Sequence, residues 1–298
     1  MVERIATFTQ SGAMTRELLR LQSEYAESSA QASSGLKSSS YQGISEDTFK
    51  LLQLQSSYDH LVAQSENAQT ALDRTEYMYS SLSSMAELIA SVTSELSSAI
   101  SNGDGGTIDE TAADALTEFA ALLNAQISGN YLFGGSVTDT APVDVSALAS
   151  LTSPTSADIS YYQGDSYLAS VKASDTLNVS YGVTADNSAF EQAIRAFQLV
   201  VSNPSDAVSL NEAYNLLQSA TADIAEVQAS VSSKASLIDN KISENSEDMN
   251  LLDSMISGIR DADLAEVTVK ITELETQLEA AYSITSKLLN LKLTDYLK

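Results

Sequence analysis

The residues that could carry out chemistry are few and scattered. The chain has no cysteine and a single histidine, His60. This excludes disulfides, thiolate metal sites, cysteine nucleophiles and any helical metal site that needs two histidines. A Ser-His-Asp arrangement stays formally possible. Because His60 follows Tyr58 and Asp59 in a helical pattern without clustered partners, we interpret it as a solvated or seam residue.

Carboxylates offer a second route to catalysis, in pairs such as those of glycoside hydrolases. The polar middle of the chain, residues 145–186, holds four of them: Asp158, Asp165, Asp175 and Asp186. No two of these have helical spacing, and no motif fixes a catalytic geometry. We therefore expect no enzymatic activity, no cofactor and no catalytic, cofactor-binding or metal-binding residue. A binding role for this segment stays open.

The charge balance restricts the possible partners. Forty acidic residues stand against fifteen basic ones in 298 residues, a net charge of −25. Phosphate backbones and anionic lipids need clustered Lys and Arg, so we expect neither nucleic acid nor membrane as a partner. Residues 1–25 lack the apolar core of a cleaved signal peptide, and no apolar run approaches the ~18 residues of a membrane span.

Long stretches with one apolar stripe flank that polar middle. Met14, Leu18, Leu21 and Tyr25 share one helical face. Residues 31–47, rich in Ser and Gly, then predict a loop. A long helix over 47–101 follows, and its seam has an unbroken 4-3 spacing. The predicted seam consists of Leu61, Ser65, Ala68, Leu72, Thr75, Tyr79, Leu82, Ala86, Ile89, Thr93, Leu96 and Ile100.

Shorter helices and a second long helical arm follow this first arm. A shorter helix with Ile108 and Ile127 on one face folds back on the first arm, and another contains Phe190 and Phe197. The second long arm, from 205 to 257, includes Leu217, Ile224 and Val231, and a last helix begins near Leu264. Between the arms, three runs alternate apolar and polar residues and predict short antiparallel strands. These runs are 159–161, 167–171 and 177–181.

We therefore predict a mainly α fold: an elongated antiparallel helical bundle or coiled coil built from both termini, with a small inserted β-rich domain. Residues 1–45 and 258–298 would be terminal coiled-coil core helices. Residues 46–130 and 187–257 would form the long helical bundle, and residues 131–186 the outer β-rich domain.

Terminal helices with one apolar stripe cannot bury it alone, which favours a polymer subunit. The predicted polymerisation core consists of Leu18, Leu21, Leu274, Leu278, Leu288 and Leu291. The predicted packing residues of the long bundle are Leu61, Leu72, Leu82, Leu217, Ile224 and Val231. For this second set, burial inside one subunit is an equally good interpretation, because a heptad does not say whose helix it faces.

Three stretches together resemble one family. The loop QASSGLKSSSYQGISED (31–47) and the terminal segment from SGIRDADLAE to the Leu-rich tail (257–297) resemble those of bacterial flagellins and hook–filament junction proteins. YLFGG (131–135) then resembles the point where the helical core of that family ends and its outer domain begins.

The resemblance implies a structural subunit of the extracellular bacterial flagellum that polymerises through its terminal helices. Its implied partners are copies of itself, neighbouring hook-associated and cap proteins, the flagellar export apparatus and a chaperone of the C-terminal helix. The start at 5–10 and the loop at 41–45 depart from filament flagellins, so filament and junction roles stay open. An unrelated secreted coiled-coil fibre or binding protein is a further alternative.

Overall fold

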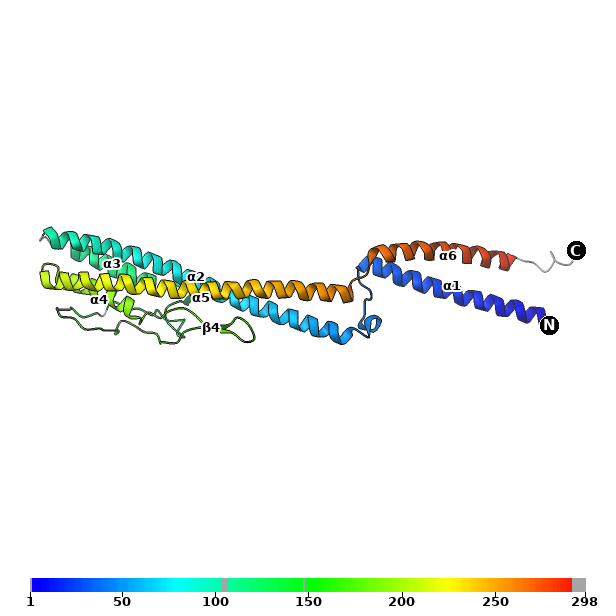
Figure 1. The fold of residues 1–298 in the computed structure, drawn as a ribbon, viewed down its shortest axis with the longest axis horizontal. Helices are drawn as coiled ribbons and strands as arrows, with labels where there is room; N and C mark the ends of the chain where they lie inside the picture. Colours follow the sequence, from blue (N-terminus) through cyan, green and yellow to red (C-terminus); the bar gives the residue numbers. More distant parts are fainter. Residues whose placement is uncertain (1, 103–106, 147, 291–298) are drawn as a thin grey trace. The chain divides into compact units, whose positions relative to one another are not determined.

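A computed structural model describes residues 2–102, 107–146 and 148–290, with side chains from residue 12 to 287. Within these ranges the fold is mainly α, as predicted, with six α-helices, one 3-10 helix and four short strands (Figure 1). The helices are α1 (Val2–Ser34), α2 (Thr48–Asn102), α3 (Ile108–Leu123), α4 (Ser188–Ser202), α5 (Ala207–Arg260) and α6 (Leu264–Asn290). The short 3-10 helix η1 is Tyr41–Ile44, and the strands are β1 (Gln126–Ile127), β2 (Asn130–Tyr131), β3 (Ser170–Lys172) and β4 (Asn178–Ser180).

The chain divides into two compact units. Met1–Asp59 and Met249–Lys298 form the terminal unit, and His60–Asp248 forms the central unit. Both boundaries fall inside long helices, α2 and α5. The predicted division into terminal core, long bundle and outer domain stays a prediction about roles in an assembly.

The centre of the core in the central unit is aromatic. Phe119 of α3 makes edge-to-face contacts with two rings of α4, at centroid distances of 6.3 Å to Phe190 and 5.8 Å to Phe197. Phe133 adds a third such contact to Phe190, at 6.1 Å. All four rings are fully buried. The α3–α4 pair is therefore held by large, geometrically specific side chains.

The buried stripe of α2 differs from the predicted seam in one of its two rows. Ala68, Thr75, Leu82, Ile89 and Leu96 are buried as expected. The second buried row, however, is Ala71, Met78, Met85 and Val92. The sequence had indicated the row one residue further on, which contains Leu72, Tyr79, Ala86 and Thr93. Of these only Leu72 is buried, and Tyr79 is exposed. The buried face of the helix is thus rotated towards Met78 and Met85, which lie in the main core cluster of the central unit.

Two antiparallel hairpins lie in the middle of the chain. In the first, β1 pairs with β2 across Ser128 and Gly129, which both have positive φ (51° and 81°). That backbone is typical of a two-residue hairpin turn. Ile127, expected on a helix face, is therefore in a strand, because α3 ends at Leu123.

In the second hairpin, β3 pairs with β4 with Val171 opposite Val179. These valines pack with Ala68 of α2 and Ile238 of α5 in a small separate core. The predicted strands at 167–171 and 177–181 are thus confirmed in shortened form. The predicted strand at 159–161 is not formed, since only Tyr162 makes an isolated bridge, to Val143. Tyr161 is instead buried as a single anchor, and its hydroxyl donates to the carbonyl of Ala185 at 2.9 Å.

The YLFGG stretch inserts two apolar side chains into the core and then turns sharply. Leu132 and Phe133 are buried. A Cβ on Gly134 would lie 2.4 Å from the carbonyl oxygen of Val137. Gly135 has φ +74°, and a Cβ there would lie 2.1 Å from Asp165 Oδ1. Both glycines are therefore required by close approach, and Gly135 also by its backbone conformation.

Candidate functional site

The terminal helices α1 and α6 lie side by side within the terminal unit (Figure 1). Leu21, Leu274 and Leu278 are buried between them, and Leu18 is half-buried against this cluster. Four of the six predicted polymerisation residues therefore meet in one place. Leu288 lies in α6 but its side chain is outside the described residues, as is the whole of Leu291.

Polar contacts fix the register of this helix pair. Gln22 Nε2 donates to Tyr282 Oη at 2.7 Å, and Tyr25 Oη donates to Glu275 Oε1 at 2.9 Å. As the residue number of the contact rises along α1, the number of its partner on α6 falls, so the two helices are antiparallel. Such contacts at the edge of a narrow apolar seam specify alignment more than they add stability.

The pair leaves considerable apolar surface uncovered. Val269 and Leu19 are 69% and 58% exposed, and Tyr282 and Ile284 are each 49% exposed. Two helices bury only one stripe each, so the remaining apolar side chains face solvent in the monomer. Apolar surface of this kind on a soluble chain is typical of an interaction site.

The loop after α1 is tied to the segment between α5 and α6. Leu36 and Asp261 form an antiparallel bridge, and the amide of Ala262 donates to the carbonyl of Gly35 at 2.9 Å. Lys37 Nζ also donates to the carbonyl oxygen of Gly258, which caps the end of α5, at 2.7 Å. Gly35 has φ +72°, the left-handed conformation that ends a helix. The Ser-Gly-Leu-Lys motif thus clamps the two terminal helices at one end.

The predicted packing residues of the long bundle lie in the central unit. Leu72, Leu82, Leu217, Ile224 and Val231 are buried within this chain, and Leu61 is half-buried. Their side chains are covered by their own subunit, which is the second of the two interpretations that the heptad left open. A role for them between subunits stays a prediction.

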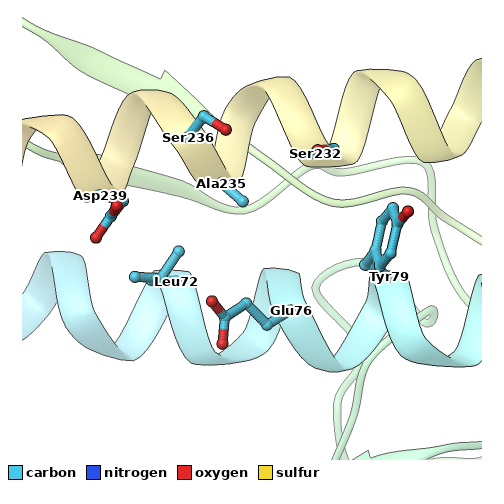
Figure 2. A pocket seen from close by; sticks show the side chains of 7 residues that line it. All are labelled: Leu72, Glu76, Tyr79, Ser232, Ala235, Ser236 and Asp239. Carbon is cyan, nitrogen blue, oxygen red and sulfur yellow. The ribbon is translucent and has the colours of Figure 1, made fainter.

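A groove runs between α2 and α5 on the side where the predicted seam had been placed. Figure 2 shows Leu72, Glu76 and Tyr79 on one helix, facing a stretch of α5 that contains Ala235 and Asp239. The groove has a volume of about 430 Å³ and remains open because the α5 wall is built of small side chains, Ser232, Ala235 and Ser236. Its two carboxylates make it acidic, and no basic residue lines it.

The one histidine has a hydrogen-bond partner that its position in the sequence does not indicate. His60 Nε2 lies 3.0 Å from Asp175 Oδ1, 115 positions further along the chain. Gln64 Nε2 and Lys172 Nζ reach the same carboxylate oxygen at 3.1 and 2.9 Å. The hydrogen bond from Lys172, followed by that from His60, lowers the pKa of Asp175 to about 2. These contacts fix the β3–β4 hairpin against α2.

The other three acidic residues of segment 145–186 also accept hydrogen bonds that stabilise loops. Asp165 accepts the amides of Ser136 and Tyr167, at 2.8 and 3.0 Å, and the hydroxyl of Ser136, and these bonds lower its pKa. Asp158 accepts from Ser160, and Asp186 accepts the hydroxyls of Ser166 and Thr184.

Each acid therefore has a structural partner in its own loop or a neighbouring one. Among the described residues no three His, Cys, Asp or Glu side chains gather as a metal site would require. In the same part of the chain, no helix combines the length and apolarity needed to cross a bilayer.

Comparison with known families identifies the C-terminal part. Residues 214–297 match the bacterial flagellin C-terminal helical region. The C-terminal part of the chain is thus similar to the flagellin family. The predicted resemblance is thereby confirmed over most of α5 and the whole of α6, including the helix that packs on α1. A comparison with curated protein sequences gave no match.

Solved structures show a related fold. The chain superposes on a flagellar hook-associated protein from Vibrio parahaemolyticus with a TM-score of 0.55 and 18% identity, covering 72% of this chain and 97% of that one. A second similar structure is FlgL from Bacillus cereus, with a TM-score of 0.31, 13% identity, and coverage of 76% and 99%. The likeness to the first of these structures shows a similar fold.

Proposed function

We propose that this chain is a structural, non-enzymatic subunit of the extracellular bacterial flagellum, which polymerises through α1 and α6 to serve motility. The observation that supports this most directly is the flagellin C-terminal region over residues 214–297. Its last helix presents Val269, Tyr282 and Ile284 to solvent although α1 is already packed against its other face. Neighbouring subunits would cover these side chains, since burying apolar surface drives association.

The assembly that we propose is unclosed and head-to-tail. Contacts between different patches of identical subunits generate helical filaments when the rotation does not close. The partners would be further copies of this chain, together with the hook-associated and cap proteins that adjoin such a filament. Export would involve the flagellar export apparatus and a chaperone that covers α6.

The second candidate is the junction between hook and filament. The fold similarity to a hook-associated protein favours it. Quantitative mass spectrometry of filaments sheared from the source cells separates the two roles. A chain that makes up most of the filament mass is the filament subunit. A chain present in trace amounts beside another, dominant flagellin is the junction protein.

A pair of matched substitutions tests polymerisation through the terminal helices. Val269 of α6 and Val208 of α5 are 69% and 65% exposed. Val269→Asn is expected to raise the critical concentration for assembly by about tenfold while thermal unfolding of the monomer stays unchanged, because one apolar contact of this size amounts to about 1.5 kcal/mol or more. Val208→Asn is the control and should assemble normally. Equal assembly of both variants with the unmodified chain would contradict a role for α6.

A further inference from the structure

A cleft of about 500 Å³ opens between α2 and the β3–β4 hairpin in the central unit. Gln64, Asn67 and Arg74 line its helical wall, and Ser170, Lys172 and Tyr181 line the opposite wall. Of these, Gln64 is 5% exposed and its Nε2 donates to Asp175, so the floor of the cleft is firmly built. The cleft is distinct from the acidic groove between α2 and α5.

The lining of this cleft opposes the charge of the molecule. The chain has forty acidic and fifteen basic residues, yet no acidic residue lines the cleft, whereas Arg74, Lys172 and His60 do. Lys172 and His60 share the carboxylate of Asp175, which lies outside the lining. Arg74 therefore brings an uncompensated positive charge to the cleft.

Arg74 differs from two other cations of this unit, which are paired with carboxylates. Arg195 is hydrogen-bonded to the buried Glu191, and Lys241 forms an ion pair with Glu244. The Nε atom of Arg74 is buried and has no hydrogen-bond acceptor among the described residues. A buried guanidinium donor without an acceptor costs free energy. An acceptor that enters the cleft and reaches the guanidinium would offset this cost.

Further donors surround this position without protein partners of their own. No hydrogen bond of the side chains of Asn67, Ser170 or Tyr181 is found within the described part of the chain. Arg is the side chain best suited to bind the two oxygens of a carboxylate or the oxygens of a phosphate, through two parallel N–H donors. Hydroxyl and amide donors around it would satisfy the remaining oxygens of the same group.

We propose that the cleft between α2 and the β3–β4 hairpin is a binding site for a small oxyanion, a phosphate or carboxylate group, held by Arg74 and Lys172. The site uses residues that take no part in the α1–α6 pair, so its ligand binding goes beyond the proposed assembly function. Binding would also brace the hairpin against α2, since the two walls would contact one ligand.

The test is a titration of the full-length soluble chain with inorganic phosphate, followed by NMR of the Arg74 side-chain Nε–H group and of the Ser170 and Lys172 amides. We expect saturable shifts at all three positions. Arg74→Gln is expected to weaken binding at the amides by about tenfold or more, which is the effect of losing a charge-assisted hydrogen bond. Lys234→Gln, which removes an exposed lysine of α5, is the matched control and should bind phosphate normally.

Circular dichroism melting establishes that each variant folds. If Arg74→Gln melts early, Lys172→Gln on the opposite wall provides the same comparison. Absence of saturable shifts, or equal affinity in Arg74→Gln and the unmodified chain, would overturn the proposal. If phosphate gives no shifts and Arg74→Gln raises the critical concentration for assembly, the cleft receives a carboxylate of a second copy instead, and the small-ligand site is wrong.

Discussion

Gly182 lies against the side chain of Met78. A Cβ at position 182 would come within 3.1 Å of both the sulfur and the terminal methyl of that methionine. Met78 belongs to the buried row of α2, and Gly182 follows β4 with φ +90°. The close approach lets the segment after the hairpin pack against the helix. It connects the inserted module with the long helix through a close contact, at a backbone conformation that L side chains rarely adopt.

Gly182→Ala is therefore expected to destabilise the central unit by about 1–3 kcal/mol, through backbone strain and displacement of Met78. Urea unfolding followed by circular dichroism measures the loss. Gly258→Ala is the control, because a Cβ there meets nothing within 4 Å. It should be neutral or slightly stabilising, since alanine favours a helix. Equal stability of the two variants would refute the close-contact account, and a double-mutant cycle with Met78→Ala separates the contact from the strain.

Phe119 is expected to be a dominant core residue. Replacing it with alanine removes the ring that contacts Phe190 and Phe197 and leaves a cavity, at a cost of about 3–5 kcal/mol. Phe49→Ala is the matched control, since Phe49 is 81% exposed and should change the free energy of unfolding by about 0.5 kcal/mol or less. A loss below 1 kcal/mol at Phe119 would mean that the α3–α4 pair repacks readily.

Glu212 is expected to give the protein a pH-dependent contact. Its Oε1 accepts the amide and hydroxyl of Thr155, at 2.8 and 2.5 Å, and its carboxylate also accepts the hydroxyl of Ser153. Burial raises the pKa of Glu212, but the hydrogen bonds outweigh it and the pKa is lowered. A lowered pKa in the folded state means that the contribution to stability is present above the unfolded pKa of about 4.3 and is lost as the pH falls through the folded value.

Glu212→Gln should therefore reduce the free energy of unfolding by about 1 kcal/mol at pH 7, and the difference from the unmodified chain should shrink below about pH 4. Thermal unfolding from pH 7 to pH 3 provides the measurement. Glu226→Gln, on the exposed surface of the same helix, is the control. A difference that grows towards low pH would have the wrong sign and would exclude this explanation.

Assembly is expected to become easier as ionic strength rises. The net charge of −25 makes neighbouring subunits repel one another. Raising NaCl from about 0.1 M to about 1 M shortens the Debye length from about 10 Å to about 3 Å and weakens this repulsion. The critical concentration, measured by sedimentation, should fall, and KCl should act as NaCl does. Fastest polymerisation at low ionic strength would show that attraction between charges, and not apolar contact, drives assembly.

The long helices were accessible from the sequence because they depend on local signals, whereas the end of α3 at Leu123 was not predicted. The spacing of three and four residues along α2 predicted one long helix, although Ser65, Thr75 and Thr93 interrupt its apolar row. The Ser- and Gly-rich loop after α1 was predicted at 31–47 and begins after Ser34 in the structure. The pairing of α1 with α6 also followed from their matching stripes, since Leu21 and Leu274 each needed one partner face. The family resemblance rested on the loop at 31–47, the terminal segment at 257–297 and YLFGG at 131–135.

The tertiary structure decided which side of each helix is covered. A heptad leaves adjacent rows almost equivalent, so spacing alone did not distinguish Met78 from Tyr79 on α2. The choice depends on what packs there, and Gly182 comes more than a hundred positions later in the sequence. The same holds for the contact of His60 with Asp175 and for the cleft beside Arg74. Local propensity fixes the helices, whereas burial and charge pairing depend on distant segments that only the folded chain brings together.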